Sequence, residues 1–217
     1  QSKRLMNMVH AIELVHKQPP IPLLTTDEVS LAPEWQNLFM AIDKGNRNEA
    51  LELFNLIPFD DVILQPLLEV HPEAYLKKII TDSIEAQRKG IKRINADILL
   101  TPKTFEILIK DIAATLLNPA KLNFSFGLPS HHAFSSEGSG FCILNKTAIL
   151  MRHAQANCNT PLKCIVVGTD VNRDNGLCAI LREFASLMPV RHIDIFDSRV
   201  YPQQDHVFIR REFKTEG

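Results

Sequence analysis

Apolar residues recur at helical spacing in three stretches of the first half of the chain. Residues 46–57 predict a short helix. Pro72 can open a second helix, because its missing N–H costs nothing in a first turn. Thr101 and Pro102 are a typical start for a third, as N-cap and first helical residue. The faces expected to be buried are Ala50, Leu51, Phe54 and Ile57; then Tyr75, Leu76, Ile79, Ile80 and Ile84; then Phe105, Leu108, Ile109, Ile112 and Leu116.

The second half alternates between strand and helix patterns. Strands are expected over 122–126, 162–167 and 192–196, and helices over 145–155 and 177–187. The run 162–167 is almost continuously apolar, which predicts a strand buried on both faces. Strand, helix and strand at this spacing indicate right-handed crossovers and a mainly parallel sheet between two helical layers. We therefore expect an α/β fold with three layers, α/β/α.

Two polar loops follow predicted strands, over residues 127–140 and 168–176. Ligands of such sheets bind beyond the carboxyl ends of the strands, so these loops are expected to meet at the functional site. The start of the chain differs in character, with the proline-fixed segment Gln18-Pro19-Pro20-Ile21-Pro22. We divide the 217 residues into a partly helical extension, 1–60, and an α/β domain, 61–217.

Composition narrows the function classes. Lys and Arg number 24 and Asp and Glu 25, so the net charge is −1, which argues against a nucleic-acid binder. No apolar run reaches the roughly 18 to 20 residues of a membrane-spanning helix, and no apolar signal core follows the basic start. The four cysteines, Cys142, Cys158, Cys164 and Cys178, form no CxxC pair, which predicts free thiols in a reducing compartment such as the cytoplasm.

The first polar loop contains adjacent histidines, His131 and His132. Neighbouring side chains in a turn diverge, so one imidazole can take a proton from water while the other stabilises or donates. Two surface histidines in a polar loop are the simpler interpretation of the dipeptide alone.

The segment after the histidines, Gly140-Phe141-Cys142-Ile143-Leu144-Asn145, changes that balance. With the His-His-Ala before it, it resembles the loop of the histone deacetylase and acetylpolyamine amidohydrolase superfamily. The stretch from His71 to Tyr75 and the stretch 97–104 resemble two upstream motifs of that family, in the same order. The resemblance implies an arginase/deacetylase-like α/β fold, of which roughly the first half is present.

The resemblance also implies roles for residues. His131 and His132 would be the paired general acid and base, and Phe141 would line the channel for an acyl-lysine or acylpolyamine substrate. Gly140 would offer its carbonyl to the substrate amide, and Asp97 would lie at the channel rim. The cofactor implied is zinc.

The second polar loop departs from the family pattern Asp-x-Asp-x-His-His-Gly-Asn-Gly. Asp170 and Asn172 stand at the metal-ligand positions, but Asn172 replaces a histidine, and an amide oxygen suits K⁺ or Mg²⁺ better than zinc. Gly168 replaces an aspartate, so one loop histidine is expected to lose its carboxylate partner. Asn175 could hydrogen-bond the second histidine. The same segment fails as an EF-hand, because its twelfth position is Leu181 rather than Glu.

Two functions stay open from the sequence. One is a metal-dependent amidohydrolase; the other is a catalytically inactive relative that uses the fold for binding or scaffolding. A Rossmann-type nucleotide binder is disfavoured, because no G-x-G-x-x-G follows a strand. A half sheet exposes an edge and an apolar face, so a second chain or the remaining half of the domain is expected as a partner.

Overall fold

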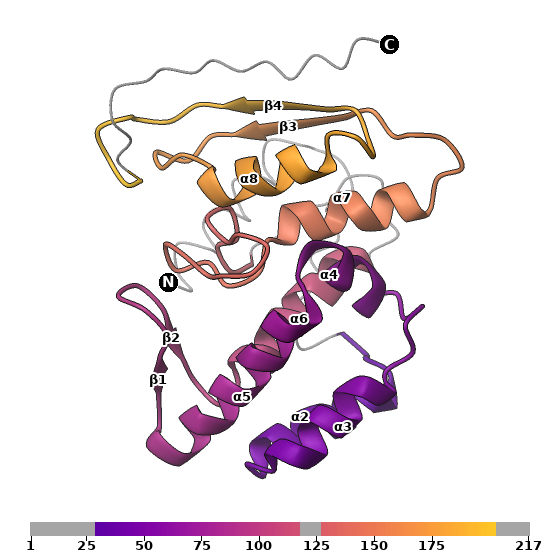
Figure 1. Ribbon diagram of the computed structural model, residues 1–217, viewed down its shortest axis with the longest axis vertical. Helices are drawn as coiled ribbons and strands as arrows, with labels where there is room; N and C mark the ends of the chain where they lie inside the picture. The colour runs from indigo at the N-terminus through magenta and orange to yellow at the C-terminus, as the bar shows by residue number, and fades with distance from the viewer. Residues whose placement is uncertain (1–28, 118–126, 203–217) are drawn as a thin grey trace, which may run out of the picture.

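The computed structural model describes residues 29–117 and 127–202 (Figure 1). Its elements are α2 (Pro33–Asp43), α3 (Arg47–Leu56), α4 (Leu64–Val70), α5 (Glu73–Lys89), β1 (Lys92–Arg93), β2 (Leu99–Leu100), α6 (Thr104–Leu116), α7 (Lys146–Ala156), β3 (Cys164–Gly168), α8 (Asn175–Phe184) and β4 (Val190–Asp194). The strand predicted over 122–126 lies outside the described residues. Helices α2 and α4 were not predicted.

The predicted helices exist, with shifted ends. Asn46 caps α3 by accepting a hydrogen bond from the Glu49 N–H, 3.3 Å. Helix α5 begins one residue after Pro72. Helix α6 begins at Thr104 rather than at Pro102, and the Thr104 hydroxyl accepts a hydrogen bond from the Thr101 N–H. The predicted inner faces are confirmed: all of them are buried except Leu51, which is half-buried.

One hydrophobic core joins the helices. Helices α2 and α3, which a boundary at residue 60 assigns to the extension, contribute Trp35, Leu38 and Phe54 to it. The ring of Phe39 meets that of Phe105 edge to face, with centroids 6.4 Å apart. Figure 1 shows α5 and α6 as a long central pair between the α2–α3 hairpin and the α7–α8 layer.

The sheet is the main difference from expectation. Strands β3 and β4 are parallel, as predicted, with Cys164 opposite Val190 and Gly168 opposite Asp194. The described residues form only this two-stranded sheet and the antiparallel pair β1–β2, so the three-layer arrangement is not established for them.

Burial on β3 and β4 alternates along each strand instead of covering both faces. Helices α7 and α8 lie on one side of the pair (Figure 1), and no other described helix lies on the opposite side. The side chains of Ile165 and Val167 are therefore 70% and 55% exposed. Continuous apolar sequence predicted a sheet buried on both faces, and within the described residues that prediction is wrong.

Buried polar groups hold the loop before α7 in place. The His71 side chain receives a hydrogen bond at Nε2 from the Asn145 N–H, 2.9 Å, which leaves Nδ1–H to donate to the Ser135 carbonyl, 2.8 Å. Four residues further along the chain, in the first turn of α5, the Tyr75 hydroxyl donates to the Ile143 carbonyl, 2.9 Å. Asn145 in turn donates from its side chain to the Ala133 carbonyl and caps α7. His71 and Tyr75, the first and last residues of the first deacetylase-like upstream motif, thus position the loop.

Burial lowers the pKa of His71 from 6.5 to about 4, so the folded protein holds this imidazole neutral. The unfolded chain takes up the proton first as the pH falls, so we expect the free energy of unfolding to decrease from about pH 6.5 to pH 4, by roughly 3 kcal/mol from this residue. Urea unfolding across that window measures it. His71→Gln is expected to be less stable and to lose most of this slope. Burial also lowers the pKa of His153, on α7, so His153→Gln should lose a smaller part of the slope than His71→Gln does. An unchanged slope in His71→Gln contradicts the assignment.

Candidate active site

The two loop histidines are held by the first turn of α8. The Leu177 N–H donates to the His131 carbonyl, 2.9 Å. A Cβ added to Gly176 would meet the main-chain atoms of His132 and Ala133 closer than 3.0 Å, so the helix approaches the histidine backbone as closely as only glycine allows. The packing of α8 therefore fixes the backbone position of both histidines.

Each histidine has a different partner on the second polar loop. His131 Nδ1 lies 2.7 Å from Asp174 Oδ1, and His132 Nδ1 lies 2.6 Å from Asn175 Oδ1. The bond from His132 to Asn175 confirms the sequence expectation. The ring centroids of the two histidines are only 3.9 Å apart, so the two imidazoles lie against each other.

These partners shift the two imidazoles in opposite directions. The hydrogen bond to Asp174, against a smaller effect of burial, raises the pKa of His131. Burial lowers the pKa of His132, and the nearby His131 adds to that decrease. Adjacent titratable groups whose environments move their pKa values apart are the arrangement that general acid and base catalysis requires.

A tight turn lies above His132. Ser139 and Cys142 exchange both main-chain hydrogen bonds, and the two residues between them have positive φ, 50° at Gly140 and 66° at Phe141. A Cβ on Gly140 would lie 2.5 Å from His132 Cδ2, so glycine is needed both for φ and for space. The Phe141 side chain is 72% exposed, which places an unshielded aromatic ring on the same turn as the residue that covers His132.

Tyr201 completes this side of the site and was missed in the sequence. Its ring meets His132 edge-on, with centroids 5.1 Å apart, and its hydroxyl is hydrogen-bonded to the Ser139 hydroxyl. No pattern in the sequence marks Tyr201, since six residues of irregular chain separate it from β4.

Asp97 lies on the exposed tip of the β1–β2 hairpin. The side chain of Asn95, on the same tip, donates to the Gly138 carbonyl, 3.0 Å, so the tip is fixed to the histidine loop. The Asp97 N–H is bonded back to Asn95 Oδ1. Asp97 is therefore at the border of the site, with its carboxylate in solvent.

Asp170 and Asn172 follow β3, but their described contacts are not those of paired metal ligands. Asp170 Oδ1 accepts a hydrogen bond from the Asn172 N–H, 2.8 Å. The Asn172 amide donates to the Tyr201 carbonyl, 2.7 Å. One carboxylate and one amide, without an imidazole, do not fit the nitrogen and oxygen donor set that catalytic zinc uses.

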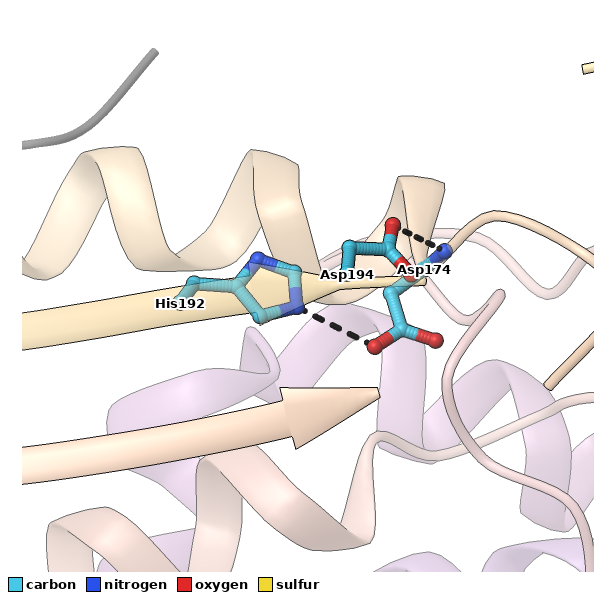
Figure 2. Close-up of side chains that lie close together, drawn as sticks. All are labelled: Asp174, His192 and Asp194. Carbon is cyan, nitrogen blue, oxygen red and sulfur yellow. Dashed lines mark hydrogen bonds and ion pairs between the residues drawn. The ribbon is translucent and has the colours of Figure 1, made fainter. Parts of the chain in front are cut away.

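A different group of side chains has the spacing of metal ligands: Asp174, His192 and Asp194, whose potential ligand atoms all lie within 4.8 Å of one another. Figure 2 shows His192 and Asp194 extending from β4 toward Asp174. His192 Nε2 lies 3.1 Å from Asp174 Oδ2, and the Asp174 N–H donates to Asp194 Oδ2, 3.0 Å.

The imidazole in this group is engaged as a cation. Burial opposes its charge, but hydrogen bonds to Asp174 and Cys178 raise the pKa of His192 to about 9. The three side chains thus form an ion-paired cluster here. Two carboxylates and one imidazole are also a donor set that a metal ion uses when it displaces the imidazole proton. Spacing could have found it, since His192 and Asp194 are two residues apart on one strand and share a face.

Asp174 also corrects the expectation drawn from Gly168. The family motif has an aspartate where this chain has Gly168. We therefore expected one loop histidine to lack a carboxylate partner. The structure places the Asp174 carboxylate in that space: a Cβ on Gly168 would lie 2.9 Å from Asp174 Cγ and closer still to Oδ2. His131 therefore keeps a carboxylate partner, supplied from six residues further along the chain.

Comparison with known proteins supports the resemblance to deacetylases. A family model, the histone deacetylase domain, matches residues 35–216, and the chain belongs to that family. A probable deacetylase of Methanothermobacter thermautotrophicus is 29% identical over 123 residues, which are 54% of this chain and 36% of that protein. Histone deacetylase 6 of Caenorhabditis elegans is 35% identical over 60 residues, 28% of this chain and 6% of that protein.

A solved structure shares the fold. The crystal structure of the HDA15 HD domain superposes with a TM-score of 0.55 at 21% identity, covering 82% of this chain and 52% of the other. The chain thus spans about half the length of that domain and about a third or less of the two curated relatives. No helix among the described residues is long and apolar enough to cross a membrane.

A substitution at Gly176 tests this close approach, because helix propensity and steric overlap change the stability in opposite directions. Alanine is normally preferred to glycine in a helix by up to about 1 kcal/mol. We nevertheless expect Gly176→Ala to destabilise the protein by roughly 1–3 kcal/mol, because its methyl group must displace the histidine backbone. Chemical unfolding measures the change. Gly90→Ala is the control: its φ of 82° adds backbone strain, but no atom lies within 4 Å of the new methyl group. A stabilised Gly176→Ala protein contradicts the packing argument.

Proposed function

We propose that this chain carries the acid–base part of a deacetylase-type amidohydrolase site, which removes acyl groups from acyl-lysine or acylpolyamine-type amides. The observation that carries the proposal is the pair of adjacent imidazoles, each oriented through Nδ1 by its own partner, Asp174 or Asn175. Such orientation leaves the Nε2 atom of each ring for proton transfer, and we propose that a water and an amide react beside the two rings.

The roles follow from the two environments. His132, whose pKa is lowered, takes a proton from water as the water oxygen adds to the acyl carbonyl carbon. His131, whose pKa is raised, donates its Nε2 proton to the amide nitrogen as the C–N bond breaks. The products are a carboxylic acid and a free amine, and the proton on His132 replaces the one that His131 lost.

Substrate contacts are proposed by resemblance to the family. Phe141 would line the path of the acyl-bearing chain. Its exposed ring is free to contact the apolar part of such a substrate. Gly140 would accept a hydrogen bond from the substrate N–H, and Asp97 would meet a cationic or amide group at the rim. Asp170 and Asn172 would be the nearest residues for a metal such as K⁺ or Mg²⁺, and no step above depends on one.

A binding or scaffolding module without catalysis is the second candidate, and one observation favours it. The position where the family pattern has a histidine ligand holds Asn172, whose amide is already bonded to the Tyr201 carbonyl. In that case the histidines and Phe141 would bind an acylated side chain without hydrolysing it.

The assay of purified chain with an acetyl-lysine peptide and an acetylated polyamine separates the two functions. For the enzyme we expect release of acetate and amine, and a decrease of roughly 10²- to 10⁴-fold in kcat for His132→Ala. His153→Ala, on α7 and outside the site, should keep the parent rate. The binding module is supported instead if calorimetry detects binding of the peptide but no hydrolysis occurs with any of several added divalent metal ions. Metal analysis of the same sample reports which ion, if any, is held.

The partner that we propose is a second chain or the remaining half of the domain, lying on the exposed face of β3 and β4. The face is apolar, and an exposed patch of this kind usually marks an interaction surface. The compartment that we propose is the cytoplasm, because the four cysteines are free thiols.

This face predicts association that can be measured. We expect the 217-residue chain to self-associate with increasing concentration in sedimentation velocity, and the double variant Ile165→Thr/Val167→Thr to remain smaller under the same conditions. Ile107→Thr, which changes an exposed residue on α6, is the matched control. If parent and double variant sediment alike as monomers, this face is not an association surface.

A further inference from the structure

We propose that Asp174 and His192 are positioning residues for His131, and that together they form a His131–Asp174–His192 relay in which Asp174 takes the place of the side chain that residue 168 lacks. The consequence for catalysis rests on the proposed function, whereas the positioning itself does not.

The first step is that the Asp174 carboxylate is held at both oxygens. Oδ1 is 2.7 Å from His131 Nδ1 and Oδ2 is 3.1 Å from His192 Nε2. The Asp174 main chain is fixed as well, since its N–H donates to Asp194. The residue is only 4% exposed, so water does not compete for these bonds. A carboxylate held in this way can accept from His131 in one orientation only.

The second step concerns space. A side chain at residue 168 and the Asp174 carboxylate exclude each other, because a Cβ on Gly168 would overlap Oδ2 of Asp174 and come within 3.0 Å of Asp194 Oδ1. Glycine at 168 is therefore a condition for the relay. Of the residues described, Gly168 and Asp194 lie opposite each other on β3 and β4, so both strands contribute to the space.

The third step concerns charge. Asp174 and Asp194 bring two carboxylates into a largely buried space, and a buried carboxylate needs a positive or hydrogen-bonding partner. The His192 side chain, 7% exposed, is the cationic group placed against Asp174 on the side away from His131. The Asp174 carboxylate thus meets one imidazole at each of its oxygens, His131 at Oδ1 and His192 at Oδ2.

The relay therefore assigns a task to each member. Asp174 fixes the proton of His131 on Nδ1 and raises the affinity of the ring for a second proton at Nε2. His192 holds the Asp174 carboxylate in place through its second oxygen. Neither residue touches substrate in this scheme, so both act through His131.

The test is ¹⁵N-edited NMR of the histidine rings in the full chain, which reports both the tautomer and the pKa of His131 without a substrate. In Asp174→Asn we expect the pKa of His131 to fall by at least about one unit and its Nδ1–H preference to be lost. Gly168→Ala, which leaves every titrating group in the sequence, should produce the same change by displacing Asp174. His192→Gln should give a smaller change of the same sign.

Two control variants accompany these. Asp60→Asn removes an exposed carboxylate far along the chain and should leave the His131 signals unchanged, and His153→Gln assists their assignment. Backbone amide spectra establish that each variant is folded. If Asp174→Asn fails to fold, Gly168→Ala and His192→Gln carry the test.

Failure of this inference and failure of the proposed function are distinguishable. Unchanged His131 signals in folded Asp174→Asn and Gly168→Ala overturn the relay, whether or not the parent hydrolyses amides. Altered His131 signals support the relay even if the parent shows no turnover, in which case the proposed hydrolysis is wrong. With an active parent, the basic limb of its pH–rate profile, which the general acid sets, should move with the measured pKa of His131 in each variant.

Discussion

The contact of the first turn of α8 with the histidine loop is the constraint on which the site depends. Because Gly176 lets the helix lie directly on the His132 and Ala133 backbone, the two residues before it, Asp174 and Asn175, come under the two imidazoles. From the other side, His71 and Tyr75 hold the same loop through its main chain. The histidine loop is thus fixed from two separate helical layers. Although the loop has no regular secondary structure, its histidines are held as firmly as the helices that contact it.

The sequence predicted what depends on local periodicity. The inner faces of α5 and α6, the parallel β3–β4 pairing and the positions of both polar loops follow from which residues are apolar and at what spacing. Family resemblance added the histidine pair and its turn. The helix ends were displaced by one to three residues. Helix α6, for example, begins at Thr104 rather than at Pro102, and the Thr104 hydroxyl accepts a hydrogen bond from the Thr101 N–H.

What the sequence did not predict depends on contacts between distant residues. The partner of His131 was sought at residue 168, because the matching position of the family pattern carries the carboxylate. Which side chain fills that space is decided by the path of the chain after β3, and periodicity contains no information on that path. Tyr201 was missed for the same reason, because it reaches the site from irregular chain. The spacing of His192 and Asp194 marks a shared strand face, but only the fold shows that this face meets Asp174.

The exchange between residues 168 and 174 bears on how such chains are classified. A sequence alignment shows a lost aspartate at residue 168 and a separate substitution at residue 174. Judged position by position, it would class this chain as an inactive relative. In three dimensions the negative charge has been conserved while its point of attachment to the backbone has moved. Inventories of inactive relatives built from aligned columns will therefore contain proteins whose missing group is present in space, and a search for acidic atoms around each imidazole would separate these from true losses.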